Sequence, residues 1–329
     1  LEWEDAKAKL LISQIALQQN DYDKAIFFLK EGFSSQEAPL SAKIQLLDAL
    51  IDKVSLTASL TDLLDQLLKI YPTRFEAIAF VGDAYLKLDK KVEALSNYRK
   101  AITLEGADYN VWQQVISIEF QNLEYDSVIR HCDQALERYP NQALLYFYNG
   151  VAHYSNKEFE TAERLLSYGR KYVGDPNLLG FFYAQLGDIY NSLEQYPQSD
   201  EAYKKALAIN PENEHVLNNY SYFLCLRKQQ LIKAKDMSKR LIKKHPENAT
   251  YLDTYGWILF TMKQYEEAEI YLRKATLIDE NGTVIEHYGD VLFELGQFKK
   301  ALTQWRKAKE LGGTTDSIEL KIKNSEIHD

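Results

Sequence analysis

The stretch GDVLFELGQFKKALTQWRKA, residues 289–308, occurs in two closely related forms earlier in the chain. GDIYNSLEQYPQSDEAYKKA covers residues 187–206, and GDAYLKLDKKVEALSNYRKA covers residues 82–101. Each form opens with a small residue, continues with apolar residues at helical spacing, crosses a short polar turn and ends in a second helical pattern. Such distant copies indicate a shorter repeat that is best preserved at these places.

Alignment of the chain on the opening small residue gives nine repeats, whose opening positions lie 33 to 37 residues apart. Repeats 1, 2 and 4 depart most from the pattern, and Asp48 and Ile116 replace the small residue in two of them. One helical hairpin cannot bury its own apolar face, so neighbouring repeats must stack into a continuous core. The opening positions are Ser13, Asp48, Gly82, Ile116, Gly150, Gly187, Ser221, Gly256 and Gly289.

Two further columns keep the same register. A second small position follows twelve residues after the first, where it lets the two helices of a hairpin approach closely, and it holds Ala94, Ala162, Ala268 and Ala301 among others. Four residues later, on the same helix face, comes a large side chain that fills the space between helices. This column includes Tyr98, Cys132, Leu166, Tyr203, Leu272 and Trp305. Proline then often ends the second helix, because it lacks an N–H and clashes with the preceding turn.

These columns resemble the tetratricopeptide repeat family over nearly the whole chain. The resemblance implies an all-α fold, an α-solenoid in which about nine helical hairpins wind into a right-handed superhelix over residues 1–313. Residues 314–329 are predicted to form a C-terminal capping helix, with Ile318 and Ile322 covering the last repeat.

Composition and motifs exclude several functions. The net charge of −9 argues against general nucleic-acid binding, which depends on neutralising phosphates. The two cysteines match no zinc or redox spacing, and no phosphate-binding, hydrolase or metalloprotease motif occurs. His287 stands beside Glu286 and Asp290 on one helix, where a groove histidine is a simpler interpretation than a metal ligand. We therefore predict a non-enzymatic protein without cofactor or metal.

The first helices of tetratricopeptide hairpins line a concave groove that binds peptides or helices of partners, and the resemblance places the site there. The residue after each opening position should face this groove; the column reads Gln14, Ala49, Asp83, Ser117, Val151, Asp188, Tyr222, Trp257 and Asp290. Aromatic, amide and carboxylate side chains suit peptide binding, and an acidic groove favours neutral or basic segments. The predicted site residues are Asp83, Gln113, Gln114, Tyr148, Tyr154, Asp188, Asn191, Asn218, Tyr222, Asp253, Trp257, Glu286 and Asp290.

A basic run in residues 227–244 has two interpretations. On the outer face of a second helix it would be a solvated surface, and the sharper hypothesis is contact with an anionic lipid or an acidic partner.

The last repeats, residues 216–313, also resemble bacterial outer-membrane tetratricopeptide lipoproteins, some of which are protease adaptors. Leu252, Asp253, Gly256 and Trp257 carry one part of this resemblance, and the EH-x-GD segment that ends at Asp290 carries another. The resemblance implies a scaffold in the bacterial cell envelope, with the cytoplasm as the alternative. The first residues, LEWEDAKAKLL, read as the middle of a helix, so we expect a preceding segment that would hold any membrane anchor.

Three functions remain open at this stage. The chain is a scaffold or adaptor for a protein or peptide partner, the regulatory region of a larger enzyme, or an enzyme with a site in the groove. Exposed ends of the repeat stack would also allow self-association.

Overall fold

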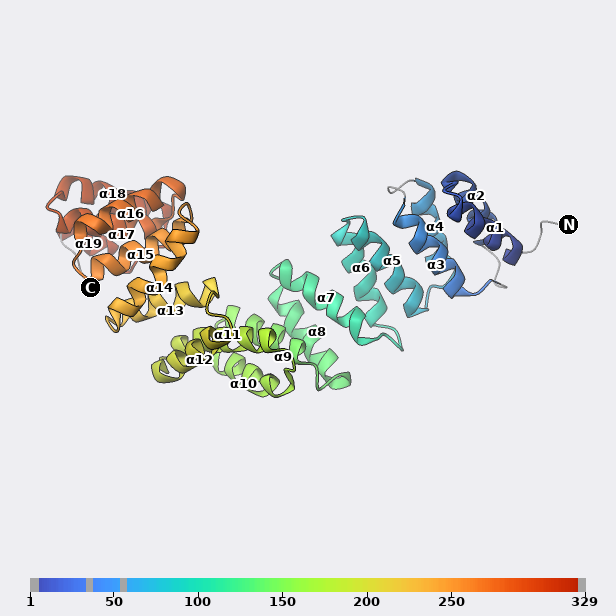
Figure 1. Ribbon diagram of the computed structural model, residues 1–329, viewed down its shortest axis with the longest axis horizontal. Coiled ribbons are helices and arrows are strands. Elements are labelled where there is room, and N and C mark those ends of the chain that lie inside the picture. The colour runs from blue at the N-terminus through green and yellow to red at the C-terminus, as the bar shows by residue number, and fades with distance from the viewer. Residues whose placement is uncertain (1–5, 34–37, 54–57, 325–329) are drawn as a thin grey trace. The chain divides into compact units, whose positions relative to one another are not determined.

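The computed structural model describes residues 6–33, 38–53 and 58–324. Within these ranges the chain is all-α: nineteen α-helices and one short 3-10 helix occur, and there is no strand (Figure 1). The helices follow one another as nine consecutive pairs and one final short helix. The predicted all-α solenoid of stacked hairpins is therefore confirmed.

The chain divides into two compact units, Leu1–Tyr172 and Val173–Asp329. The first unit contains α1 (Ala6–Gln18), α2 (Tyr22–Phe33), α3 (Leu40–Ile51), α4 (Ala58–Ile70), α5 (Phe75–Lys87), α6 (Lys91–Ile102), α7 (Tyr109–Gln121), α8 (Tyr125–Arg138), α9 (Ala143–Ser155), α10 (Phe159–Gly169) and the 3-10 helix η1 (Arg170–Tyr172). The second contains α11 (Pro176–Ser192), α12 (Tyr196–Ile209), α13 (Glu214–Leu226), α14 (Leu231–Lys244), α15 (Ala249–Thr261), α16 (Tyr265–Ile278), α17 (Gly282–Glu294), α18 (Phe298–Leu311) and α19 (Ile318–Asn324). The division falls in the fifth repeat's longer connection, where η1 replaces the last helical turn and Pro176 starts the next helix.

The register of small and large columns is visible in the packing of each hairpin. A Cβ added to Gly187 would lie 2.5 Å from the ring of Tyr203, and one added to Gly256 would lie 2.6 Å from Leu272. Gly82, Gly150 and Gly289 meet the large residue of their own hairpins in the same way. Because a real Cβ never approaches so closely, the large side chain of the second helix occupies the space that glycine leaves on the first.

The turn inside each hairpin repeats one backbone conformation. The residue seven positions after the opening small position has a positive φ wherever the structure describes it. These residues are Asn20, Asp89, Leu123, Lys157, Glu194, Lys228, Lys263 and Gly296. The left-handed conformation is uncommon for residues other than glycine, so the packing of the flanking helices imposes it.

The last helix, α19, covers the end of the second unit. Ile318 and Ile322 pack with Leu292, Ala301 and Trp305 of the last repeat. The capping helix was expected over residues 314–329; α19 begins at Ile318, and residues 325–329 lie outside the described part of the chain.

Candidate functional site

The three aspartates that follow an opening glycine share one hydrogen bond. Each accepts from a donor fifteen residues later: Asp83 from Tyr98 Oη at 2.6 Å, Asp188 from Tyr203 Oη at 2.5 Å and Asp290 from Trp305 Nε1 at 2.8 Å. In the remaining repeats the large position has no such ring donor and the aspartate is absent too. Each aspartate of the acidic column therefore occurs together with an aromatic donor in its own hairpin.

Asp188 does not present a free carboxylate. Its side chain is buried, and besides Tyr203 it contacts His215 Nε2 at 2.7 Å and Asn219 Nδ2 at 2.9 Å, both from the next first helix, α13. Three polar partners satisfy this carboxylate within the second unit. The prediction that Asp188 lines an accessible groove is therefore corrected: it holds α11, α12 and α13 together.

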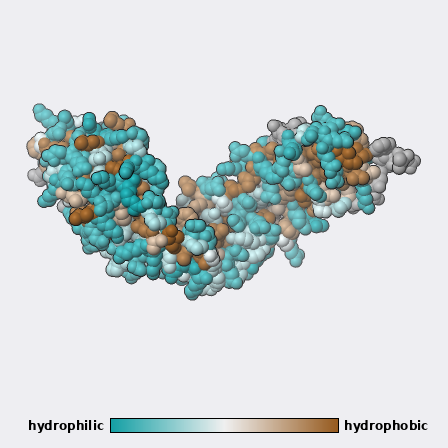
Figure 2. Space-filling view, in the orientation of Figure 1, coloured by the Kyte–Doolittle hydropathy of each residue, from teal (hydrophilic) through white to brown (hydrophobic). Residues whose placement is uncertain are grey.

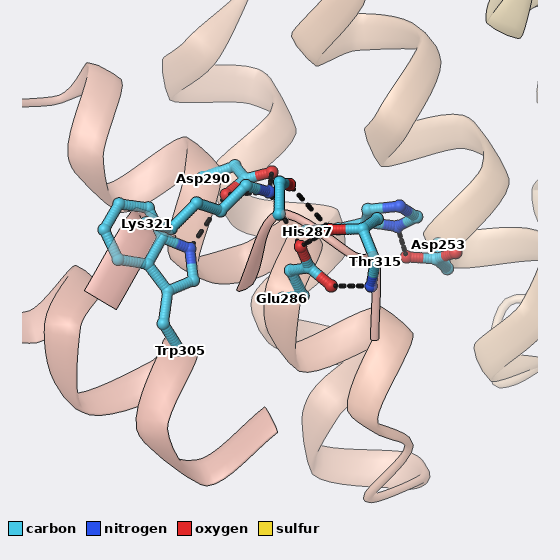
Figure 3. A network of polar contacts seen from close by, with 8 residues as sticks. Asp253, Glu286, His287, Asp290, Trp305, Thr315 and Lys321 are labelled. Carbon is cyan, nitrogen blue, oxygen red and sulfur yellow. Dashed lines mark hydrogen bonds and ion pairs between the residues drawn. The ribbon is translucent and has the colours of Figure 1, made fainter. Parts of the chain in front are cut away.

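Glu286 and Asp290 are also buried, beneath α19 (Figure 3). Lys321 Nζ lies 2.8 Å from Glu286 Oε1 and 2.8 Å from Asp290 Oδ2, and Thr315 donates its backbone N–H to Glu286 at 2.7 Å. The prediction that both carboxylates face an accessible groove is corrected as well, because the C-terminal helix fills their position. Burial raises the pKa of Asp290 above its ordinary value even with Lys321 beside it, whereas Lys321 and Thr315 outweigh burial and lower the pKa of Glu286.

Asp83 is the member of the column that remains accessible. It lines a cleft of about 390 Å³ together with Gln114, and the walls come from α3, α5, α6 and α7. Ile44, Phe75, Phe80 and Val111 supply apolar walls, and Asp108, Asn110 and Gln114 supply polar ones. We call this cleft the Asp83 pocket; it brings together two of the predicted site residues, Asp83 and Gln114.

The carboxylate of Asp83 is exposed by surface area, yet the concave walls partly desolvate it. This desolvation raises the pKa of Asp83 despite the hydrogen bond from Tyr98, and Asp48 and Asp108 raise it further. The charge of Lys87 opposes this rise, although Lys87 is itself paired with Asp48 and Asp52.

The Asp83 pocket continues into two more clefts of the first unit. A cleft of about 530 Å³ shares Ile44 and Glu76 with it, and a cleft of about 450 Å³ shares Pro39 and Gln45 with the second. The last of these is mainly apolar, runs between α1 and α3, and has Lys7 and Lys53 among its lining residues. Figure 2 shows apolar surface gathered over the first hairpin, where Leu11 is 57% exposed. We call these three clefts together the inner trough.

Sequence reasoning missed most of the inner trough. Gln14 and Ala49 stand in the predicted groove column and line the apolar cleft, but neither was selected as a site residue. The signal was available, since this cleft joins the groove positions of repeats 1 and 2. Repeats 1 and 2 match the repeat pattern poorly, so the site was predicted in the later repeats.

Three further predicted residues of the first unit lie outside the Asp83 pocket, and two of them, Tyr148 and Tyr154, pack against neighbouring rings. Tyr148 lies 5.0 Å from Phe120 between ring centroids, and Tyr154 lies 5.5 Å from Phe159. Gln113 is half-buried on α7, outside the Asp83 pocket.

In the second unit, Trp257 and Asp253 flank one histidine. The ring of Trp257 stacks on His287 at 3.9 Å and on Phe260 at 4.7 Å, while Asp253 Oδ1 lies 2.9 Å from His287 Nδ1. Trp257 and Phe260 also line a cleft of about 430 Å³. The other predicted residues, Asn191, Asn218 and Tyr222, are half-buried on the first helices α11 and α13.

At least four of the eight basic residues at 227–244 form ion pairs with carboxylates. Arg227 contacts Asp200 at 2.6 Å, Lys235 contacts Glu267 at 3.5 Å and Lys244 contacts Glu214 at 2.5 Å. Arg240 pairs with Glu212. These ion pairs balance part of the charge, whereas Lys239 and Lys243 on α14 are exposed and form no ion pair among the described residues.

We expect the stability of the second unit to depend on pH through His215. The hydrogen bond with Asp188 raises the pKa of His215 above 6.5, so its contribution is complete below that pH and is lost as pH rises through the folded-state value. The melting temperature of the wild type should therefore fall, relative to that of His215→Gln, as the pH rises from about 6.5 through the higher pKa of the folded state. Parallel melting curves for the two proteins across this range would contradict this pairing.

No group of three or more His, Cys, Asp and Glu side chains in the described residues is arranged to hold a metal ion. Cys132 and Cys225 are free and buried, and burial raises the pKa of both thiols. Within the described ranges no helix is both long and apolar enough to cross a bilayer.

Comparisons with known proteins agree with the repeat register. The family model described as tetratricopeptide repeat matches residues 6–39, 75–108, 182–213 and 249–281. A TPR repeat-containing protein, PA4667 of Pseudomonas aeruginosa, is 29% identical over 152 residues, which cover 46% of this chain and 25% of that protein. The human protein O-mannosyl-transferase TMTC3 is 24% identical over 204 residues, which cover 60% of this chain and 22% of the relative. The chain thus spans about a quarter of the length of the curated relatives it matches.

Solved structures show the same fold at low sequence identity. A tetratricopeptide repeat protein from Parabacteroides merdae has a TM-score of 0.59 and 14% identity, covering 76% of this chain and 97% of its own. The APC/C hetero-tetramer Cut9–Hcn1 has a TM-score of 0.56 and 14% identity, covering 98% of this chain and 70% of its own. The family model thus identifies tetratricopeptide repeats in this chain, and the two solved structures show the same fold of stacked hairpins.

Proposed function

We propose that the chain is a non-enzymatic scaffold that binds an extended protein segment in the inner trough of its first unit. Tetratricopeptide repeats serve in protein–protein interaction, which gives the general class of function. The observation that carries the specific proposal is the continuity of the three clefts, since each shares lining residues with the next. A row of adjoining clefts along the first helices α1, α3, α5 and α7 suits an elongated ligand.

The chemistry of the trough suggests what such a segment carries. Leu10, Leu11 and Leu46 line its first cleft and would bury apolar side chains. Asp83 and Asp108 line its far end and favour a basic side chain there. A neutral or basic segment with an apolar stretch therefore fits better than an acidic one.

Obstruction of the trough tests the proposal. Ala49 is exposed and lines the apolar cleft, so Ala49→Trp should fill the cleft without disturbing the core. Random peptides displayed on phage would be selected on the full chain, and the affinity of each enriched peptide would be measured by fluorescence anisotropy. We expect Ala49→Trp to weaken binding at least about tenfold, or about 1.4 kcal/mol.

Gln134→Trp is the matched control, because Gln134 is exposed on the second helix α8 and lines no described cleft of the inner trough. Peptides that bind both variants as well as the wild type would place binding elsewhere and refute the proposal.

The bacterial cell envelope is our proposed location, supported by the resemblance of residues 216–313 to outer-membrane tetratricopeptide lipoproteins; the likeness to PA4667 of Pseudomonas aeruginosa supports a bacterial source. A second candidate function is the repeat region of a larger enzyme, and the match to TMTC3, whose printed name is that of a transferase, favours it. Capture of the native protein with an antibody against the chain would distinguish the scaffold from the enzyme. A captured protein of several domains with transferase activity supports the enzyme, and a captured protein without that activity supports the scaffold.

A further inference from the structure

The three aspartates of the acidic column stand in one geometric relation to the next first helix. Asp188 Oδ1 accepts from Asn219 Nδ2, and Asp290 Oδ2 pairs with Lys321 Nζ; in both cases the partner follows 31 residues later in sequence. These two donors come from α13 and α19, each of which packs beyond the aspartate's own hairpin. In two of three cases, therefore, the chain itself places an N–H donor on the aspartate.

The third case lacks this donor. Gln114 follows Asp83 by the same 31 residues (114 − 83), yet the hydrogen bond of Asp83 within the described residues is the one from Tyr98 to Oδ1. Asn110 occupies the place that His215 takes beside Asp188, and it does not contact Asp83 either. The space that Lys321 fills next to Asp290 is here the open volume of the Asp83 pocket.

Basic groups near this pocket are already engaged. Lys87 Nζ lies 2.8 Å from both Asp48 and Asp52, and Arg74 pairs with Glu76 at 3.0 Å. Asp83 itself forms no ion pair among the described residues, and neither does Asp108 on the opposite wall of the pocket.

We propose that the Asp83 pocket binds the ammonium group of a lysine in the partner segment, in the position that Lys321 Nζ takes beside Asp290. This inference rests on the proposed function and names the residue that the trough recognises. An ammonium has three donors, which match Asp83 Oδ2 and the amide oxygens of Asn110 and Gln114. The apolar walls of Ile44 and Val111 suit the methylene stem.

Lysine fits this pocket better than arginine. A guanidinium binds a carboxylate best through two parallel hydrogen bonds, and Asp83 Oδ1 is already occupied by the hydroxyl of Tyr98. A compact ammonium needs just one carboxylate oxygen. The pocket should therefore discriminate between two cations of equal charge.

Two substitutions test the inference with little risk to the fold. Asp83→Asn keeps an oxygen for Tyr98 and removes the charge. Gln114→Lys places an internal ammonium where Lys321 stands relative to Asp290, so it should close the pocket from within. Gln134→Lys adds the same charge on the outer helix α8 as a control.

The probes are the phage-displayed random peptides selected on the wild-type chain, and each variant is measured by anisotropy. We expect enriched peptides to share one lysine, whose replacement by arginine or norleucine weakens binding. Asp83→Asn and Gln114→Lys should each weaken binding at least tenfold, and Gln134→Lys should not. The Asp83→Asn variant should bind the lysine peptide and the norleucine peptide with equal affinity.

Peptides that are blocked by Ala49→Trp but carry no shared lysine would overturn this inference and leave the proposed function standing. The same conclusion follows if Asp83→Asn and Gln114→Lys bind lysine peptides as tightly as the wild type. Peptides indifferent to Ala49→Trp would overturn the proposed function itself.

Discussion

Lys321→Met is expected to lower the unfolding free energy of the second unit by about 3–5 kcal/mol, the cost of leaving a buried charge without its partner. Lys321 is 3% exposed and compensates two buried carboxylates, Glu286 and Asp290. Its loss would leave both carboxylates buried without a lysine partner, held by the hydrogen bonds from Thr315 and Trp305. The amides of α17 and α18 report on this, because their hydrogen exchange should accelerate in proportion to the lost stability.

Lys323→Met is the matched control, since Lys323 lies on the same helix and is exposed. A triple variant with Glu286→Gln and Asp290→Asn removes the uncompensated charges and should recover much of the loss caused by Lys321→Met. Equal exchange rates in Lys321→Met and Lys323→Met would show that the buried ion cluster does not hold α19 in place.

Gly256→Leu is expected to destabilise the second unit by about 1–3 kcal/mol through overpacking. The added Cβ alone would lie 2.6 Å from Leu272 Cγ, so α15 and α16 must move apart. Chemical denaturation followed by circular dichroism would measure the change in midpoint.

The double variant Gly256→Leu with Leu272→Ala exchanges the large and small positions of this hairpin. Its loss of unfolding free energy should be smaller than the sum of the losses in the two single variants, because each substitution relieves the packing defect of the other. Gly174→Leu serves as the control, since no atom lies within 4 Å of a Cβ at Gly174. Additive losses in the double variant would contradict the register on which the repeat alignment rests.

The sequence predicted the hairpins because their columns are local and periodic. Small and large positions recur at fixed offsets within one repeat, as in Gly187 and Tyr203, and each repeat contacts mainly its neighbours. The turns were harder to specify, because their left-handed residue is glycine only at Gly296 and otherwise has side chains as different as Leu123 and Glu194. Helix packing, and not the residue type, fixes that conformation.

The site was predicted less well, because exposure depends on the side chains that the next repeat brings. Asp83, Asp188 and Asp290 look alike within their own repeats, and one register position in the next first helix separates them: Gln114 leaves the pocket open, whereas Asn219 and Lys321 close it. The pattern within one repeat does not include the neighbouring repeat, so it cannot distinguish the buried carboxylates of Asp188 and Asp290 from the accessible one of Asp83.

The most direct test of the central claim is photo-crosslinking in native extract with a benzophenone side chain at Gln45, which lines two clefts of the inner trough. The same group at Gln134 reports on the outer face. We predict crosslinks to a defined protein segment from position 45, lost in the presence of Ala49→Trp, and none to that segment from position 134. Crosslinks of equal yield from both positions, or crosslinks from position 45 that survive Ala49→Trp, would contradict binding in the inner trough.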